Sequence, residues 1–244
     1  MRYRWVIFDV DGVLIDTGES YDIATKLTVE YFLGTMGRNV EIDIESIRVL
    51  RRRGSFGNDF LLCEALIRAG IGEDTDYLVK NFPLGGDIEW VRKRYNVKIE
   101  MDEIERAFNT FYLGNYYNNP IFEFNGLWKR DKPLVEKEAL IEINKKVKVG
   151  VITGRNLLEL NLAEGILGFK FKKSVTREMY LKPDPRALWH ITRGEKGIYL
   201  GDTTVDELLV ENYRKRYGKH MDFIMIGRAV STVNEAIGEI LEHL

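Results

Sequence analysis

The first strong pattern in the chain is an apolar run that ends in closely spaced acidic residues. Residues 5–8 are Trp, Val, Ile and Phe, and Asp9-Val10-Asp11-Gly12 follows. A run rich in β-branched and aromatic residues is typical of a buried strand. Successive side chains of an extended backbone alternate, so we expect Asp9 and Asp11 to share one face and Gly12 to permit a turn. An ordinary strand followed by a polar turn would fit the same residues.

Residues 17–125 change the pattern from strand to helix. Hydrophobic positions recur there at helical spacing, with the apolar side chains of each segment on one face. The predicted helices are 19–33, 44–50, 59–69, 77–82, 88–95 and 102–112. We therefore expect an inserted all-helical domain with its own small core.

From residue 126 onward, predicted strands and helices alternate. The predicted strands are 147–152, 173–176, 197–200 and 223–226, and the predicted helices are 134–146, 156–167, 186–193, 204–217 and 232–241. Pro133 stands where a helix can begin. Repeated strand-helix order indicates a parallel sheet covered on both faces. The predicted fold class is α/β, with a Rossmann-like parallel-sheet core at 1–16 and 126–244 and the helical insertion at 17–125.

The composition is that of a globular chain with balanced charge. Its 244 residues are 45% hydrophobic, which suffices for one large domain or two modest ones. Lys and Arg number 36 against 38 Asp and Glu, so the overall charge indicates neither nucleic acid nor a membrane as the main partner. Cys63 is the single cysteine, which favours a reducing compartment. Without a long apolar signal or bilayer-spanning stretch, we expect a cytoplasmic protein.

Four polar clusters stand at or near the ends of predicted strands. They are Asp9 with Asp11, Thr153 with Gly154, Lys182, and Asp202 with Asp206. Each has a simpler explanation: a polar turn, an exposed loop lysine, or a cap for the next helix. Ligands of open α/β sheets, however, bind beyond the carboxyl ends of strands. The shared position of the clusters therefore favours one common site.

The charge of such a site predicts either protonated carboxylates or a bound cation. Four aspartates within about 5 Å would repel one another by roughly 20 kcal/mol at an effective dielectric of about 20. Domain stability is only roughly 5 to 15 kcal/mol, and Lys182 offsets part of the repulsion, so protons or a cation must supply the rest. Oxygen ligands without His or Cys favour Mg²⁺. A cation, a lysine, a hydroxyl and two carboxylates suit phosphoryl transfer, in which one carboxylate attacks phosphorus and another moves protons.

The four clusters resemble the motifs of the haloacid dehalogenase-like superfamily of hydrolases. Residues 9–13 resemble its first motif, 151–154 its second, 182–185 its third and 201–206 its fourth, in the order of the family. The insertion at 17–125 is similar to the helical cap of subfamily I, which includes phosphoglycolate phosphatase-like enzymes. The resemblance implies a Mg²⁺-dependent phosphatase acting on a small phosphorylated metabolite.

The resemblance also implies a role for each motif residue. Asp9 would be the nucleophile that forms an aspartyl-phosphate, and Asp11 the general acid and base. Thr153, Gly154 and Lys182 would hold the phosphoryl group. The implied Mg²⁺ ligands are Asp9, the backbone carbonyl of Asp11, and Asp202, with Asp206 in or beside the outer shell.

Other activities of the superfamily fit the sequence less well. Expelling a halide needs no proton donor, so Asp11 argues against dehalogenation. Mutases of the family carry a histidine near the start of the first cap helix, where this chain has Tyr21, and its three histidines all follow residue 125. Phosphonate hydrolysis would need a cap lysine, for which Lys26 or Lys80 qualifies. A mutase, a phosphonatase and a non-catalytic phosphate-ligand binding protein stay open as alternatives.

Candidate substrate contacts outside the motifs are Arg53, Asn58 and Arg155. The stretch 51–59 lies where subfamily I enzymes carry a substrate-specificity loop, and its arginines suit a second anionic group. Alternatively, the three arginines at 51–53 complement a helix C-terminus and face water. Arg155 would contact a substrate anion or cover the cap interface. The expected partner is the substrate alone, with neither nucleic acid nor membrane, and the expected assembly is a monomer or homodimer.

Overall fold

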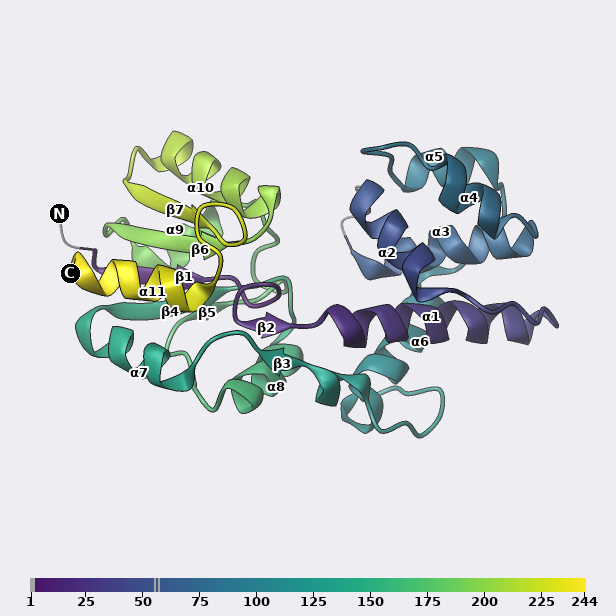
Figure 1. Cartoon of the computed structure of the whole chain (residues 1–244), viewed down its shortest axis with the longest axis horizontal. Coiled ribbons are helices and arrows are strands. Elements are labelled where there is room, and N and C mark those ends of the chain that lie inside the picture. Colours follow the sequence, from purple (N-terminus) through teal and green to yellow (C-terminus); the bar gives the residue numbers. More distant parts are fainter. Residues whose placement is uncertain (1–2, 55, 57) are drawn as a thin grey trace. The chain divides into compact units, whose positions relative to one another are not determined.

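The structure is a computed structural model that describes residues 3–54, 56 and 58–244. It divides into two compact units (Figure 1). The core unit comprises Met1–Thr17 and Asp131–Leu244, and the helical unit comprises Gly18–Arg130. The second boundary lies later than the predicted residue 125, because the 3₁₀ helix η2 (Leu127–Arg130) contacts α1 (Gly18–Thr35).

A five-stranded parallel sheet with the order β5-β4-β1-β6-β7 forms the centre of the core unit. Its strands are β1 (Trp5–Phe8), β4 (Lys148–Ile152), β5 (Ser174–Val175), β6 (Gly197–Gly201) and β7 (Met221–Met225). β1 pairs with β4 on one side and β6 on the other, and all four of its residues are buried. A central strand covered on both faces needs apolar side chains throughout, which explains the unbroken run at 5–8.

Helices cover both faces of this sheet (Figure 1). One face packs on α7 (Lys137–Lys146), α8 (Leu157–Leu167) and α11 (Val233–Glu242), and the other on α9 (Arg186–Thr192) and α10 (Thr204–Tyr217). β1 directs Val6 and Phe8 to the first face and Trp5 and Ile7 to the second, as strand alternation requires. The predicted α/β fold with a parallel sheet is confirmed.

The segment before α7 differs from the sequence prediction. Lys132–Pro133 forms β3, which pairs antiparallel with β2 (Ile15–Asp16), and the amide of Leu134 donates to the carbonyl of Leu14 at 2.8 Å. This pairing keeps the backbone extended, so the prediction of a helix start at Pro133 is wrong. β7 also begins earlier than the predicted residue 223, because it pairs with the whole of β6.

The helical unit contains α1 to α6 and has no strand among its described residues. Beyond α1, its helices are α2 (Ile44–Arg53), α3 (Asp59–Ile71), α4 (Thr75–Asn81), α5 (Ile88–Arg94) and α6 (Met101–Leu113), with the 3₁₀ helices η1 (Gly114–Tyr116) and η2. Edge-to-face aromatic pairs join α1 and α3 to α6: the ring centroids of Tyr21 and Tyr112 lie 4.9 Å apart, and those of Phe60 and Phe108 5.3 Å apart. Across the described chain, every helix is too short or too polar to span a bilayer.

Candidate active site

The site lies where β1, β4 and β6 end. Asp9 directly follows β1, Thr153 follows β4 and Asp202 follows β6. The register pairs Phe8 with Val151 and with Leu200, so all three strands end at the same level. The amide of Asp9 donates to the carbonyl of Leu200 at 2.8 Å, which extends the β1–β6 pairing to the acidic residue. The sheet itself therefore sets the place of Asp9.

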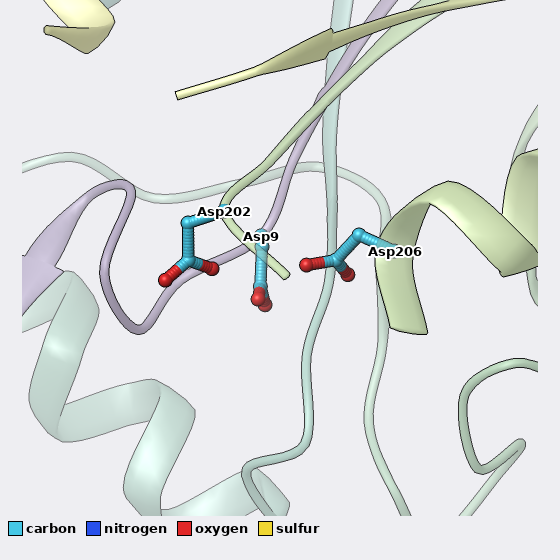
Figure 2. Close-up of side chains that lie close together, drawn as sticks. All are labelled: Asp9, Asp202 and Asp206. Carbon is cyan, nitrogen blue, oxygen red and sulfur yellow. The ribbon is translucent and has the colours of Figure 1, made fainter. Parts of the chain in front are cut away.

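Three carboxylates meet at this edge. One oxygen from each of Asp9, Asp202 and Asp206 lies within 4.8 Å of the others. Figure 2 shows Asp9 between the other two. Asp9 and Asp206 are buried, with 5% and 0% of their surface exposed. Such burial of like charges requires compensation from nearby cations or protons.

Gly12 allows the loop after β1 to approach Asp202. Its φ is +74°, and a Cβ atom there would lie only 2.1 Å from Oδ2 of Asp202. Both the left-handed backbone and the contact exclude a side chain. The absence of a side chain at residue 12 therefore allows the first motif to lie directly against the fourth.

Lys182 supplies a cation from the loop between β5 and α9. Its Nζ lies 2.8 Å from Oδ2 of Asp9 and 2.8 Å from Oδ1 of Asp206. Only 12% of its side chain is exposed, so it is not an ordinary loop lysine on the surface. Burial alone would lower the pKa of Lys182, but Asp9 and Asp206 raise it above its usual value. The ammonium group therefore stays charged.

Both carboxylate oxygens of Asp206 are engaged within the protein. Oδ1 accepts hydrogen bonds from Lys182 at 2.8 Å and from the hydroxyl of Tyr199 at 3.0 Å. Oδ2 accepts from the hydroxyl and the amide of Thr203, the N-cap of α10, at 2.7 and 3.2 Å. Asp206 thus anchors Lys182, while its other oxygen fixes the start of α10.

Asp202 has a carboxylate oxygen without a partner. Its Oδ1 is buried, and no hydrogen bond to it exists within the described part of the chain. A buried polar atom left in this state is costly. Carboxylate oxygens from Asp9 and Asp202 form the hard donor set that Mg²⁺ prefers. The residues present therefore fit a divalent metal.

The pKa values agree with a site that requires a cation. Burial raises the pKa of Asp9 to about 8, with Lys182 opposing the shift and Asp206 and Asp11 adding to it. Burial also raises the pKa of Asp202 to about 6, again with Asp206 adding and Lys182 opposing. Without a metal, these carboxyl groups bind protons more tightly than ordinary aspartates do.

Asp11 is not one of the three carboxylates within 4.8 Å of one another, and it is paired with Arg155. Its Oδ1 accepts hydrogen bonds from Nε and Nη2 of Arg155 at 3.0 and 2.7 Å. Strand β1 ends at Phe8, so the alternation that would place Asp9 and Asp11 on one face does not extend to Asp11. The clustering of the Asp11 side chain with the other three aspartates therefore stays a prediction.

Arg155 is itself held by several groups of the core unit. It is 1% exposed, its Nη2 lies 3.3 Å from Oδ2 of buried Asp131, and its Nη1 donates to the carbonyl of Glu159 at 3.2 Å. This arrangement directs the guanidinium at Asp11, so the substrate contact expected for Arg155 gains no support from it. Asp131 was missed at the sequence level because it lies within a charged run that resembles exposed surface.

The second motif supplies a hydroxyl and an open backbone. Thr153 is buried, and its Oγ1 accepts a hydrogen bond from the amide of Arg155 at 3.1 Å, which leaves its own proton available for donation. A Cβ atom at Gly154 would meet nothing within 4 Å. The open space beside the Gly154 backbone is compatible with a bound anion. The contacts of Thr153 and Gly154 with a phosphoryl group stay predictions.

Arg53 and Asn58 have structural partners inside the helical unit. Arg53 donates to the carbonyls of Val79 and Lys80 at 3.1 and 3.3 Å, in the last turn of α4. Asn58 is the N-cap of α3, and its side chain accepts from the amide of Leu61 at 2.9 Å. Ser55 and Gly57, which belong to the same predicted loop, lie outside the described residues. The substrate contacts of Arg53 and Asn58 stay predictions.

Comparison with known proteins identifies the family to which this chain belongs. A profile of the haloacid dehalogenase-like hydrolases matches residues 3–206. No curated protein sequence matches the chain. Among solved structures, phosphatase Tt82 from Thermococcus thioreducens is 56% identical with a TM-score of 0.87, over 98% of this chain and 99% of that one.

More distant structures share the fold. A HAD-superfamily hydrolase of subfamily IA from Geobacter sulfurreducens PCA is 17% identical, with a TM-score of 0.55, over 98% of this chain and 96% of its own. A predicted phosphoglycolate phosphatase from Haemophilus somnus 129pt is 12% identical, with a TM-score of 0.58, over 98% of both chains. At such identities, these similarities show the architecture alone.

Proposed function

Because the chain belongs to the haloacid dehalogenase-like hydrolases, we propose that it is a Mg²⁺-dependent phosphatase that releases phosphate from a small phosphorylated metabolite. The observation that carries the proposal is the buried Asp9–Lys182 pair at 2.8 Å beside the unpartnered oxygen of Asp202. A nucleophile, a fixed cation and a candidate metal ligand thus adjoin one another. The 56% identity to a protein described as a phosphatase also supports it.

Asp9 is the proposed nucleophile. Its Oδ1 accepts a hydrogen bond from the amide of Val10 at 2.7 Å, and its Oδ2 lies beside Lys182, so the carboxylate is held in a defined orientation. A carboxylate oxygen of Asp9 attacks phosphorus, and the bond from phosphorus to the leaving oxygen breaks. Water then attacks the aspartyl-phosphate, which releases inorganic phosphate and restores Asp9.

Asp11 is the proposed general acid and base. Two donors of Arg155 occupy its Oδ1, so the oxygen left to carry the transferred proton is Oδ2. Asp11 donates this proton to the leaving oxygen and later takes one from the attacking water. Arg155 acts here as a positioning residue, because it contacts Asp11 rather than the reacting atoms.

Thr153, Gly154 and Lys182 are proposed to bind the phosphoryl group. Lys182 contributes a full positive charge, Thr153 a hydroxyl donor and Gly154 a backbone amide. Fixed donors and charges of this kind stabilise the charge that develops on the phosphoryl oxygens. Asp206 keeps Lys182 in place through its direct ion pair.

The proposed Mg²⁺ ligands are Asp9, the backbone carbonyl of Asp11, and Asp202. Asp206 would lie beside the metal, since its own oxygens are engaged by Lys182, Tyr199 and Thr203. When bound, the metal neutralises the acidic cluster and withdraws charge from the phosphoryl group.

Residues 17–125 are proposed to act as a cap that selects the substrate and excludes bulk water. Tyr21, which stands where related mutases carry a histidine, packs against Phe108 and Tyr112. Lys26, a candidate for Schiff-base chemistry, is paired with Glu30 at 2.7 Å. The first contact favours a phosphatase over a mutase and the second disfavours Lys26 as a Schiff-base lysine, while Lys80 keeps a phosphonatase as an alternative.

The test is phosphate release from an aryl phosphate with Mg²⁺ or with EDTA. We expect turnover with Mg²⁺, loss of turnover in EDTA, and restoration when excess Mg²⁺ is added. Asp9→Asn should abolish nearly all activity, while Glu239→Gln, an exposed change on α11 away from the four motifs, should leave most of it. Turnover that persists in EDTA, or in Asp9→Asn, would exclude the mechanism. Binding without turnover across a broad panel of phosphate esters would identify a binding protein instead.

A further inference from the structure

A basic hollow lies at the amino ends of β1, β4 and β5. Its volume is about 740 Å³, and the cations that line it are Arg4, Lys145, Lys146, Lys148, Lys172 and Lys173. Asp9 follows the opposite end of β1, five residues beyond Arg4, a distance of roughly 16 Å along an extended chain. The basic hollow is therefore separate from the acidic site.

The charged side chains that line the basic hollow are all cationic. Within the part of the chain that the structure describes, no acidic residue lines it. The carboxylates on its border are Glu195, which pairs with Lys148 at 2.7 Å, and Asp222, which accepts from the hydroxyl of Tyr3 at 2.5 Å. The whole chain has a net charge of -2, so this local excess of cations is not a consequence of composition.

The fold forces these cations together. Arg4 precedes β1, Lys148 begins β4, and Lys172 with Lys173 precedes β5, while Lys145 and Lys146 end α7. Adjacent strands lie about 4.8 Å apart, so like charges at their ends repel one another. Complementing the C-terminus of α7 explains Lys145 and Lys146 but not the cations from the strands. A bound anion with several charges would relieve the repulsion.

We propose that the basic hollow binds a compact polyanion that contains three or more linked phosphates. Its volume lies within the range of about 300–1,000 Å³ that is typical of small-ligand sites, which favours a compact ligand over an extended nucleic acid strand. Lysine ammonium groups bind phosphate as point charges. Lys196 and Lys148 already cover the rings of Tyr3 and Trp5, with their Nζ atoms 4.9 and 5.3 Å from the centroids. The phosphate chain, rather than a stacked base, therefore carries recognition.

The test is calorimetric titration of the full chain with inorganic tripolyphosphate in EDTA. Lys145→Ala combined with Lys172→Ala should weaken binding by about tenfold or more. The matched control combines Lys215→Ala with Lys219→Ala, two exposed lysines elsewhere on the core unit, and should bind as the wild type does. Lys182→Ala should also leave the affinity unchanged, which separates this site from the proposed catalytic one.

Two further titrations distinguish the source of the phosphates. Equal affinity for tripolyphosphate and ATP supports recognition of the phosphate chain, and binding should weaken as NaCl rises. Tighter binding of a single-stranded RNA than of tripolyphosphate would overturn the compact-ligand proposal. Equal losses in both double variants, or a loss confined to Lys182→Ala, would show that the basic hollow is not the site.

Discussion

At the residue scale, Arg155 occupies Oδ1 of Asp11 and so leaves Oδ2 for the proton transfer proposed for this residue. Lysine in its place keeps the charge but cannot donate two hydrogen bonds from a planar fork. We predict that Arg155→Lys lowers kcat/KM, which reports steps up to departure of the leaving group, by about tenfold or more for an alkyl phosphate but by less than about threefold for p-nitrophenyl phosphate. The reason is that a basic leaving oxygen needs a general acid and a nitrophenolate hardly does.

Steady-state rates on both substrates check this prediction. Arg177→Lys is the matched control, since Arg177 bonds to the carbonyl of Gly154 and to Glu159 without touching Asp11. An equal fall on both substrates in Arg155→Lys would mean that the residue supports the fold of the site rather than proton transfer.

The raised pKa values of Asp9 and Asp202 predict that Mg²⁺ affinity depends on pH. These values are about 8 and about 6, and only the deprotonated carboxyl binds a cation. Protons therefore compete with the metal more strongly as the pH falls, so affinity should rise steadily from pH 6 to pH 8. Calorimetric titration with MgCl₂ across this range measures the effect, and a constant affinity would contradict it. Asp202→Asn should bind weakly throughout.

The sequence predicts the strand-end residues of the site better than their supporting partners. Asp9, Thr153 and Asp202 each follow a buried strand, and parallel strands end at one edge. Tyr199 and Asp131 carry no comparable signal. Tyr199 is one more buried residue within β6, and Asp131 becomes a partner of Arg155 only after the chain has folded. The Tyr199–Asp206 contact spans seven residues and the Asp131–Arg155 contact 24, and each depends on how a strand, a loop and a helix pack, which hydrophobic periodicity does not reveal.

At the scale of elements, Glu64 joins α3 to α5 inside the helical unit. Its side chain is 1% exposed and accepts from Arg68 of α3 and Arg92 of α5 at 2.7 and 2.8 Å. Removing one partner of such a buried network costs about 3 kcal/mol or more. We predict that Glu64→Gln lowers the free energy of unfolding by about this amount, whereas Glu89→Gln, on the exposed side of Arg92, costs less than about 1 kcal/mol.

The Glu64 carboxylate also makes the free energy of unfolding depend on pH. Burial alone would raise the pKa of Glu64, but hydrogen bonds from Arg92 and Arg68 lower it below its usual value. A lowered pKa in the folded state stabilises the protein above the unfolded value and loses that contribution as the pH falls. Denaturant unfolding should therefore show the full difference between wild type and Glu64→Gln at pH 7 and a shrinking one below about pH 4. A difference that stays constant in acid would contradict this assignment.

Most elements of this chain are predictable from hydrophobic periodicity, and the exceptions are short. α10 spans Thr204–Tyr217 as predicted, because Thr203 caps it and Gly218 ends it in a left-handed conformation. β2 and β3 contain two residues each and exist only because they pair with each other. A two-residue strand has no periodicity, so Pro133 could not be placed in it by local pattern.

At the scale of the whole molecule, the division into two units predicts separable folding. The helical unit is one continuous segment, Gly18–Arg130, with buried aromatic side chains such as Phe108 and Tyr112. We predict that a fragment of residues 18–130 is helical by circular dichroism and unfolds cooperatively on heating. Phe108→Ala should lower its unfolding free energy by about 3 kcal/mol, since truncating a buried Phe leaves a cavity. A fragment without a cooperative transition would contradict independent folding.

The two-unit plan is predictable because hydrophobic periodicity changes from strand to helix at residue 17 and returns to alternation near residue 126. The end of the helical unit is less clearly marked in the sequence than its start. Residues 127–130 form one 3₁₀ turn whose contacts with α1 place it in the helical unit, and a single turn has too few positions to show a period.

The contact between Gly12 and Asp202 has a practical consequence for anyone who diversifies this chain by directed evolution. Every other amino acid at position 12 would force an atom into the oxygen of Asp202 and strain a backbone that favours glycine. Codon 12 is therefore best held constant in a mutant library. Randomising this codon would produce mostly inactive variants and reveal nothing about substrate specificity.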